Sequence, residues 1–189
     1  KNPEANAEVF DGDWFKTGDL GRIDDEGYIH ITGRKKEIYV LSGGKNVAPL
    51  VVEETMKSIP VLSQVFLVGD GRKFCSALVT LDVGVILRDN LGMNPDKVPR
   101  DPMEQIEELE RRGHKLSDFV ESEEIRLDIE SQISELNKRF MNPEQIKKFT
   151  ILPRDLNIDS GELTPTLKIR RKQIRENWAD EIEAMYSEA

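Results

Sequence analysis

The stretch at residues 32–49 divides the sequence into two parts of different character. Two lysines follow Arg34, then comes an apolar run, and then the glycine pair Gly43-Gly44. The residues before this stretch are rich in turn formers and acidic side chains, whereas longer apolar and amphipathic segments follow it. We therefore predict a boundary here, between the last part of one structural unit and a second unit with a core of its own.

The composition limits the classes of protein to which the chain can belong. Its 189 residues suffice for one domain of ordinary size with an appendage. A net charge of −9 argues against a general nucleic-acid-binding protein, because phosphate contacts need a cationic surface. Cys75 is the only cysteine, so no intramolecular disulfide can form, and His30 and His114 lie too far away for a usual zinc pattern. These features fit a reducing cytoplasm, and no apolar run approaches membrane-spanning length.

The first part of the chain predicts short elements only. Asn2-Pro3 provides an N-cap and a first-turn proline for a short helix at 3–10, and an apolar strand is expected at 14–17. Residues with high β-propensity flank the acidic, glycine-closed turn at 24–27, which predicts a β-hairpin. Because the sequence begins abruptly and without methionine, we expect a fragment of a longer protein.

The second part predicts strands alternating with helices. Strands are expected at 37–41, 61–68, 74–81 and 149–152, and the second and third of these would pair as an antiparallel hairpin. Helices are expected at 48–58, 103–111, 122–140 and 169–186, and loops at 95–102 and 161–166.

The predicted helix at 122–140 has an apolar stripe at near-helical spacing, which consists of Ile125, Ile129, Ile133, Leu136 and Phe140. Such a stripe most often faces the core of its own domain. A coiled coil or a partner-binding surface is the alternative that this pattern leaves open.

Two residues near the boundary could contact a nucleotide. Asp19 ends a predicted strand, where a carboxylate can accept hydrogen bonds from a vicinal diol such as ribose. An aspartate beside glycine also commonly forms a plain turn. The planar guanidinium of Arg34 suits a phosphate or a hydroxyl pair, although most surface arginines have no such role. Lys35 and Lys36 add charge at the boundary and by default only increase solubility.

The glycine-rich segment after the predicted strand at 37–41 does not match a phosphate-binding P-loop, because the glycine and lysine spacing is wrong. The glycines still permit positive φ or close approach of a ligand to the backbone. A simple strand-to-helix turn explains the segment equally well. Its residues are Ser42, Gly43, Gly44, Lys45 and Asn46.

The most unusual local feature is the cationic run at 168–172, at the expected start of the last helix. The helix dipole disfavours positive charge at this position. The run makes sense if an anion binds there or if the loop must reach one, and Gly161, Pro153 and Pro165 suggest a preceding loop shaped for presentation.

Four motifs in this order resemble the C-terminal part of AMP-forming acyl-CoA synthetases, the superfamily shared with luciferases and the adenylation domains of nonribosomal peptide synthesis. The amino-acid sequences of the last two motifs, and a helical insert near 100–142, are most similar to those of long-chain fatty acid CoA ligases. The ordered set is highly specific and covers nearly the whole chain. The motifs are Trp14-Phe15-Lys16-Thr17-Gly18-Asp19-Leu20-Gly21, residues 31–37, residues 42–49, and Gly161-Glu162-Leu163-Thr164-Pro165-Thr166-Leu167-Lys168.

This resemblance implies two half-reactions, in which a carboxylate and ATP give an acyl-adenylate and CoA then gives the thioester. It implies that Asp19 and Arg34 contact the nucleotide, that Lys36 is the hinge between domains, and that Lys168 is the catalytic lysine of adenylation. It also implies that four residues line the path of CoA after domain rotation: Ser42, Gly43, Gly44 and Lys45. Tyr39 departs from the family pattern, because an aliphatic residue is more usual there.

We therefore predict that residues 1–35 are the terminal strands of a large N-terminal adenylation domain, and that 36–189 form its mobile C-terminal domain with the helical insert. The implied fold class is α+β, a small mixed sheet with flanking helices preceded by a β-hairpin arm. The parent enzyme would use ATP, Mg²⁺ and CoA, while the fragment alone is expected to bind none of them tightly and to be inactive. No metal-binding residue is predicted within this chain.

The expected partners are the missing N-terminal domain and a fatty acid, and not a nucleic acid. The expected location is the cytoplasm, with peripheral association at the inner membrane face left open.

Two alternatives remain at this point. One is another adenylate-forming enzyme of the superfamily, with a carrier protein or oxygen in place of CoA. The other is a non-catalytic module that binds partners through its helices.

Overall fold

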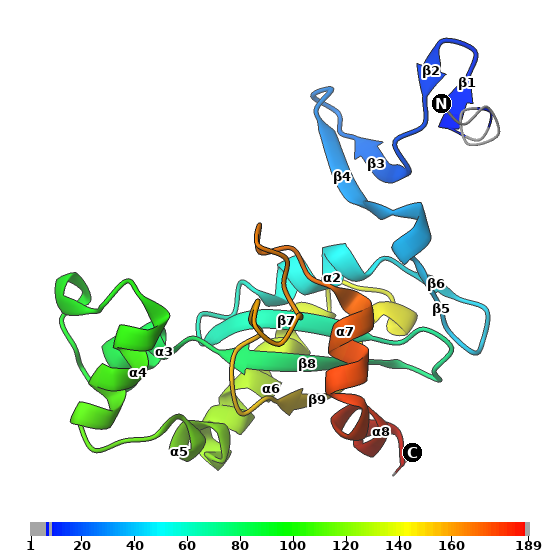
Figure 1. Cartoon of the computed structure of the whole chain (residues 1–189). Coiled ribbons are helices and arrows are strands. Elements are labelled where there is room, and N and C mark those ends of the chain that lie inside the picture. The colour runs from blue at the N-terminus through cyan, green and yellow to red at the C-terminus, as the bar shows by residue number, and fades with distance from the viewer. Residues whose placement is uncertain (1–6, 8, 188–189) are drawn as a thin grey trace.

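The centre of the structure is a three-stranded mixed sheet (Figure 1). The computed structural model describes residue 7 and residues 9–187. Strands β7 (Leu62–Val68) and β8 (Cys75–Leu81) pair in antiparallel, as predicted, and β9 (Ile146–Ile151) pairs with β8 in parallel. A parallel neighbour needs a long crossover, which the helical segment between β8 and β9 provides. The predicted α+β class with a small mixed sheet is confirmed.

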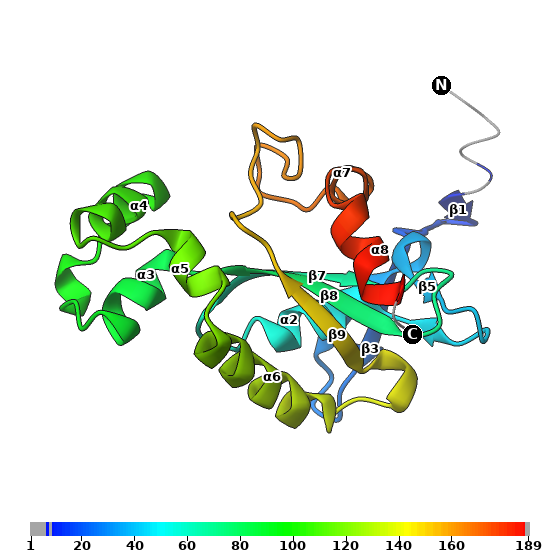
Figure 2. The ribbon, with the colours of Figure 1, turned by 90° about the horizontal axis from the view of Figure 1, so that it is seen from below.

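Helices cover both faces of this sheet (Figure 2). One face packs against α2 (Pro49–Met56) and α6 (Glu123–Asn137), and the other packs against α7 (Arg171–Asn177) and α8 (Ala179–Ser187). Because side chains alternate along a strand, β7 contributes Val65 and Leu67 to the first core and Phe66 and Val68 to the second. Burial on both faces explains why β7 is almost continuously apolar.

The stripe of isoleucines on α6 belongs to the core. Ser122 caps the helix by accepting a hydrogen bond from the Ile125 N–H at 3.4 Å, and two glutamates occupy the first turn, where the helix dipole favours them. Ile125, Ile129 and Ile133 are buried against the sheet. The core interpretation of this stripe is therefore confirmed, and α6 ends at Asn137, before Phe140.

A set of short helices lies between β8 and α6. They are α3 (Val83–Val85), the π-helical turn η2 (Ile86–Asn90), the 3₁₀ turn η3 (Pro95–Lys97), α4 (Pro102–Arg111) and α5 (Leu116–Val120). The Asp101 carboxylate caps α4 by accepting hydrogen bonds from the N–H groups of Met103 and Glu104. The predicted loop at 95–102 contains η3, and α5 was not predicted, because five residues are too few to show helical periodicity.

The N-terminal arm consists of two hairpins that project away from the sheet (Figure 1). Their strands are β1 (Phe10–Asp11), β2 (Trp14–Phe15), β3 (Asp19–Ile23) and β4 (Ile29–Arg34). The predicted hairpin is confirmed, and its turn is held by Asp24, whose carboxylate accepts the N–H groups of Glu26 and Tyr28. The helix predicted at 3–10 lies mostly outside the described residues, and Phe10 belongs to β1.

Two predicted elements differ from the structure. The strand expected at 37–41 is shorter, because η1 (Lys35–Glu37) is a 3₁₀ turn; β5 (Tyr39–Val40) follows it and pairs with β6 (Asn46–Val47). The single helix expected at 169–186 is two helices, separated at Trp178, whose φ of −117° and ψ of 32° leave the helical region. Among the described helices, none is long and apolar enough to cross a membrane.

Candidate catalytic loop, hinge and nucleotide contacts

Lys168 lies near the end of a tight turn that we call the lysine loop, residues 161–169. The Thr164 N–H donates to the Lys168 carbonyl at 2.9 Å, and the Lys168 N–H donates to the Thr164 hydroxyl at 3.0 Å. Leu163 and Ile169 form an antiparallel bridge just outside this pair. The Lys168 side chain is exposed, and no carboxylate of the described chain lies within ion-pair distance of its ammonium group.

The backbone beside Lys168 is strained. Leu167 has a φ of 59°, in the left-handed region that costs a non-glycine residue about 1 kcal/mol or more. Leu167 is also exposed, so burial of its side chain does not explain the conformation. The Leu167 N–H donates to the Thr164 carbonyl at 2.8 Å, and this bond holds the turn. Strain of this kind concentrates at functional sites.

The start of the lysine loop is held by a buried carboxylate, in what we call the Glu162 cluster. Glu162 is fully buried and accepts two hydrogen bonds from Arg154, at 2.7 and 2.8 Å. It also accepts from the Asn177 amide at 3.0 Å and from the Trp178 indole N–H at 2.8 Å. The break between α7 and α8 therefore places two donors against one carboxylate.

The environment of Glu162 also sets its titration. Burial by itself would raise the pKa of this carboxyl, but the hydrogen bonds from Arg154, Asn177 and the Asn157 N–H outweigh that effect and hold it below the usual value. Glu162 is therefore a charged anchor for the loop, and not a group poised to exchange protons near neutral pH.

The end of the lysine loop is held by a second buried ion pair, in what we call the Arg171 cluster. Arg171 donates two hydrogen bonds to Glu53 on α2, both at 2.7 Å, and one to Glu37 at 3.3 Å. It also donates to the Tyr39 hydroxyl at 3.2 Å, and that hydroxyl donates to the Leu67 carbonyl of β7 at 2.8 Å. Tyr39, the departure from the family pattern, is thus bonded on both sides.

The prediction that an anion explains the cationic run at 168–172 is wrong for Arg171. Its guanidinium turns inward, and although burial by itself would lower its pKa, the bonds to Glu53 raise it overall. Lys172 lies near Glu176 at 3.7 Å. Lys168 and Arg170 remain exposed, so the run contains both a buried structural cation and outward cations.

Asp19 and Arg34, the predicted nucleotide contacts, face each other across the β3–β4 hairpin. The Arg34 Nε lies 3.2 Å from the Asp19 Oδ1, and both side chains are partly open to solvent. The Lys35 N–H donates to the Gly18 carbonyl at 2.9 Å, which closes the hairpin just before the predicted hinge. The two residues therefore form one small polar site on the arm.

The predicted hinge residue Lys36 lies in the exposed 3₁₀ turn η1 and lines a pocket of about 540 Å³. The opposite wall of this pocket comes from the residues after Lys168, among them Ile169 and Arg171. The fold thus brings the segment next to the predicted hinge and the segment next to the predicted catalytic lysine together.

The predicted CoA-path residues form the exposed turn between β5 and β6. Gly44 has a φ of 75°, which favours glycine, and its N–H donates to the Leu41 carbonyl at 2.7 Å. Gly43 and Lys45 line a pocket of about 220 Å³ together with Lys73, Phe74 and Lys147. The lining of this pocket therefore includes three lysines and one aromatic ring.

Comparison with known proteins identifies the family of the chain. The model of the AMP-binding enzyme C-terminal domain matches residues 36–118 and 106–189. The chain belongs to the AMP-binding enzyme C-terminal domain family. The chain is 38% identical to the long-chain-fatty-acid–CoA ligase FadD15 of Mycobacterium tuberculosis, over 99% of this chain and 29% of that protein. It is 36% identical to the human long-chain-fatty-acid–CoA ligase ACSBG1, over 93% of this chain and 24% of that protein.

Solved structures with the same fold are adenylation domains. The adenylation domain of a carboxylic acid reductase from Segniliparus rugosus, in complex with AMP, superposes with a TM-score of 0.67 at 23% identity, over all of this chain and 26% of that chain. The corresponding domain from Mycobacterium chelonae gives 0.66 at 22% identity, over 99% of this chain and 25% of that one. These neighbours confirm the fold, and the chain spans about a quarter of the length of its relatives.

Sequence reasoning missed both buried carboxylates of this AMP-binding C-terminal domain. Glu53 had a visible signal, because Pro49, Val52, Glu53 and Met56 occupy the buried spacing of α2, and a charge at such a position needs a partner. Glu162 lies in a loop and shows no periodicity that could have identified it.

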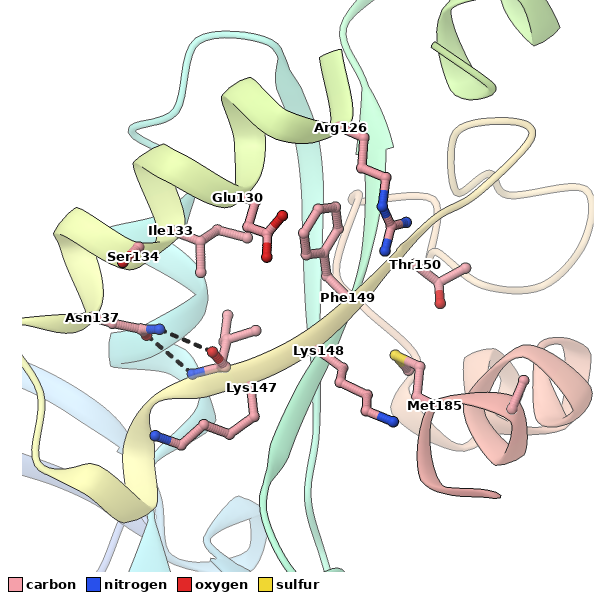
Figure 3. A pocket seen from close by; sticks show the side chains of 12 residues that line it. Arg126, Glu130, Ile133, Ser134, Asn137, Lys147, Lys148, Phe149, Thr150 and Met185 are labelled. Atoms are coloured by element: carbon pink, nitrogen blue, oxygen red, sulfur yellow. Dashed lines mark hydrogen bonds between the residues drawn. The ribbon is translucent and has the colours of Figure 1, made fainter. Parts of the chain in front are cut away.

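A further groove of about 540 Å³ follows the free edge of β9, between α6 and α8 (Figure 3). The Asn137 amide caps the first residue of this edge, since it donates to the Ile146 carbonyl and accepts the Ile146 N–H. Arg126 lies over the Phe149 ring, with 5.3 Å between its guanidinium carbon and the ring centre. This groove contains none of the predicted site residues.

Proposed function

We propose that this chain is the C-terminal part of an AMP-forming long-chain fatty acid CoA ligase. In the first half-reaction, a fatty carboxylate attacks the α-phosphorus of ATP, and pyrophosphate leaves. In the second, the thiol of CoA attacks the acyl carbon, and AMP leaves. The lysine loop is the observation that carries this proposal, because it presents an ammonium group with no carboxylate partner among residues 9–187, on a strained turn anchored at both ends.

Lys168 would act in the first half-reaction. Negative charge is redistributed between the attacking carboxylate, the α-phosphate and the leaving pyrophosphate. A lysine ammonium is a compact charge on a flexible stem, so it can follow this redistribution. The second half-reaction releases AMP from an acyl-adenylate that has already formed. We therefore expect it to need Lys168 much less.

Asp19 and Arg34 would exchange partners when a nucleotide binds. The ribose hydroxyls can donate to the Asp19 carboxylate, which in this structure forms an ion pair with Arg34. That exchange would leave the Arg34 guanidinium available to the nucleotide phosphate. Asp19 and Arg34 would thus have a charged or polar partner both with and without the nucleotide, and neither charge would be left without a partner.

The basic pocket beside Gly43 suits the phosphate groups of CoA. Lys45, Lys73 and Lys147 supply positive charge in a chain that is otherwise strongly acidic. A rotation about Lys36 would bring this face toward the acyl-adenylate. Among the described residues, no three His, Cys, Asp or Glu side chains gather closely enough to hold a metal ion by themselves.

The test compares Lys168→Ala with Lys97→Ala in a full-length protein that contains this chain. Lys97 is an exposed lysine on η3, remote from the lysine loop. We expect Lys168→Ala to slow acyl-adenylate formation by about 100-fold or more, and thioester formation from supplied acyl-adenylate by less than about threefold. Equal losses in both half-reactions would refute the role of Lys168, and Lys97→Ala should match wild type in both.

A thioester assay separates CoA from other acyl acceptors of the superfamily. We expect thioester formation with free CoA, whereas transfer only to a carrier protein would place the chain in another branch. The partner-binding alternative lost its main support when the α6 stripe proved to be buried. The isolated chain is expected to have no ligase activity, because it covers only about a quarter of the length of its ligase relatives.

A further inference from the structure

Arg171 joins the hinge to the lysine loop. Its guanidinium contacts Glu37, the residue directly after the predicted hinge Lys36, and it lies three residues beyond Lys168. It is held in place by the two bonds to Glu53, and its side chain is only 15% exposed. One rigid cation therefore links the two segments on which the proposed function depends.

The connection from Arg171 back to Lys168 is short and well held. The Arg170 N–H donates to the Glu162 carbonyl at 2.8 Å, and the Leu163–Ile169 bridge closes the loop between them. Arg171 starts α7, whose Ile174 is fully buried in the second core. A displacement of Arg171 would therefore move the base of the lysine loop with it.

The connection from Arg171 to the hinge depends on one side chain. Glu37 is 43% exposed, and Arg171 is its ion-pair partner in the described structure. Two residues later, Tyr39 is buried and bonded both to Arg171 and to β7. The chain is therefore fixed to the domain from Tyr39 onward, and Glu37 extends that attachment to the residue next to Lys36.

We propose that Arg171 and Glu37 are positioning residues that confine the hinge motion to Lys36 and transmit it to Lys168. This inference rests on the proposed function, in which the domain rotates about Lys36. Without the Glu37 contact, torsional change would spread over residues 36–38. The lysine loop would then reach its place in the first half-reaction less often, and the basic pocket beside Gly43 would reach its place in the second less often.

The test substitutions are Glu37→Gln, with Glu183→Gln as the matched control. Glu37→Gln removes the charge at the hinge and leaves the buried Arg171–Glu53 pair intact. Glu183→Gln removes the charge from a different surface pair, with Arg72, which has no hydrogen bond or ion pair to Lys36, Glu37 or Arg171 in the described structure. Substitution of Arg171 by methionine is less suitable, because it would leave Glu53 buried without a partner and endanger folding.

Two measurements are needed. Hydrogen exchange of the peptide covering residues 35–40 should become about three- to fivefold faster in Glu37→Gln, as loss of a partly exposed ion pair predicts, while β7 and β8 stay unchanged. The rates of both half-reactions should fall about threefold or more. Each rate is divided by the concentration of active sites, which the burst of pyrophosphate measures. Glu183→Gln should show neither effect.

A second substitution at Arg171 completes the test. Arg171→Lys keeps the charge but loses the planar guanidinium, which bonds to Glu53 with its two terminal nitrogens and to Glu37 with Nε, so adding Glu37→Gln to it should change little. Wild-type exchange and rates in Glu37→Gln, or equal changes in Glu183→Gln, would overturn the proposal. If the wild-type protein forms no acyl-adenylate, the ligase function fails, and the exchange measurement alone still decides whether Arg171 and Glu37 fix the hinge.

Discussion

The two ends of the lysine loop are held by Arg–Glu pairs whose partners lie at very different separations along the sequence. At the start, Glu162 pairs with Arg154, eight residues away in sequence, and at the end Arg171 pairs with Glu53, which is 118 residues away. The first pair shapes the loop from its own neighbourhood. The second ties the loop to α2, to the β5 segment and to the hinge.

The two pairs also differ in how deeply their arginines are buried. The Arg154 side chain is 38% exposed, whereas Arg171 is 15% exposed. A buried pair adds little net stability compared with apolar side chains, but loss of one partner leaves an uncompensated charge. The cost of losing the carboxylate should therefore depend on whether its arginine can regain water.

The largest expected effect is that of Glu53→Ala. It leaves Arg171 buried without its main partner, and we expect a loss of about 3–5 kcal/mol in the free energy of unfolding. Glu162→Ala should cost less, about 2–3 kcal/mol, because Arg154 can turn to solvent. Urea denaturation of both variants, compared with wild type at pH 7, measures the difference.

A matched control comes from the next residue of α2. Glu54 is exposed and lies near Lys57 at 3.4 Å, so Glu54→Ala should change stability by less than about 0.5 kcal/mol. A greater loss in Glu162→Ala than in Glu53→Ala would show that the number of hydrogen bonds at the carboxylate matters more than burial of the arginine.

A smaller effect is expected for Trp178→Phe, which keeps an aromatic ring but removes the indole N–H that donates to Glu162. Loss of one hydrogen bond to a charged acceptor should cost about 1.5 kcal/mol. Trp14→Phe is the control, because Trp14 is 82% exposed and should be neutral. Equal thermal stability of Trp178→Phe and wild type would mean that the remaining donors, Arg154, Asn177 and the Asn157 N–H, satisfy Glu162.

Much of the fold could be predicted because its signals are local. The apolar runs of β7 and β8, the capped start of α4 and the isoleucine spacing of α6 all depend on neighbouring residues. The elements that were missed have no local signal. Helix α5 is too short for periodicity, and the break at Trp178 arises where Asn177 and Trp178 both reach Glu162.

The site shows the same limit more sharply. In the sequence, Arg171 looks like Lys168, Arg170 and Lys172, and only the fold distinguishes the buried cation from the exposed ones. Glu53 occupies a buried helical spacing, but its partner lies 118 residues away and cannot be chosen from the sequence. The pairing of Asp19 with Arg34 followed from the predicted hairpin only once its register was known.

The smallest expected effect is a loosening of the Glu162 cluster in acid. The pKa of Glu162 is lower in the folded state than its ordinary value near 4.5. Its charge therefore stabilises the folded state at pH values above 4.5, and this contribution is lost as the pH falls through the lower folded-state pKa. Trp178 can report this locally, because in a Trp14→Phe background it is the one remaining tryptophan. Its fluorescence should change reversibly below about pH 4.5, and Glu162→Gln should remove that transition. A transition that persists in Glu162→Gln would assign the acid response to another carboxylate. Protonation of Glu162 would then not loosen the start of the lysine loop.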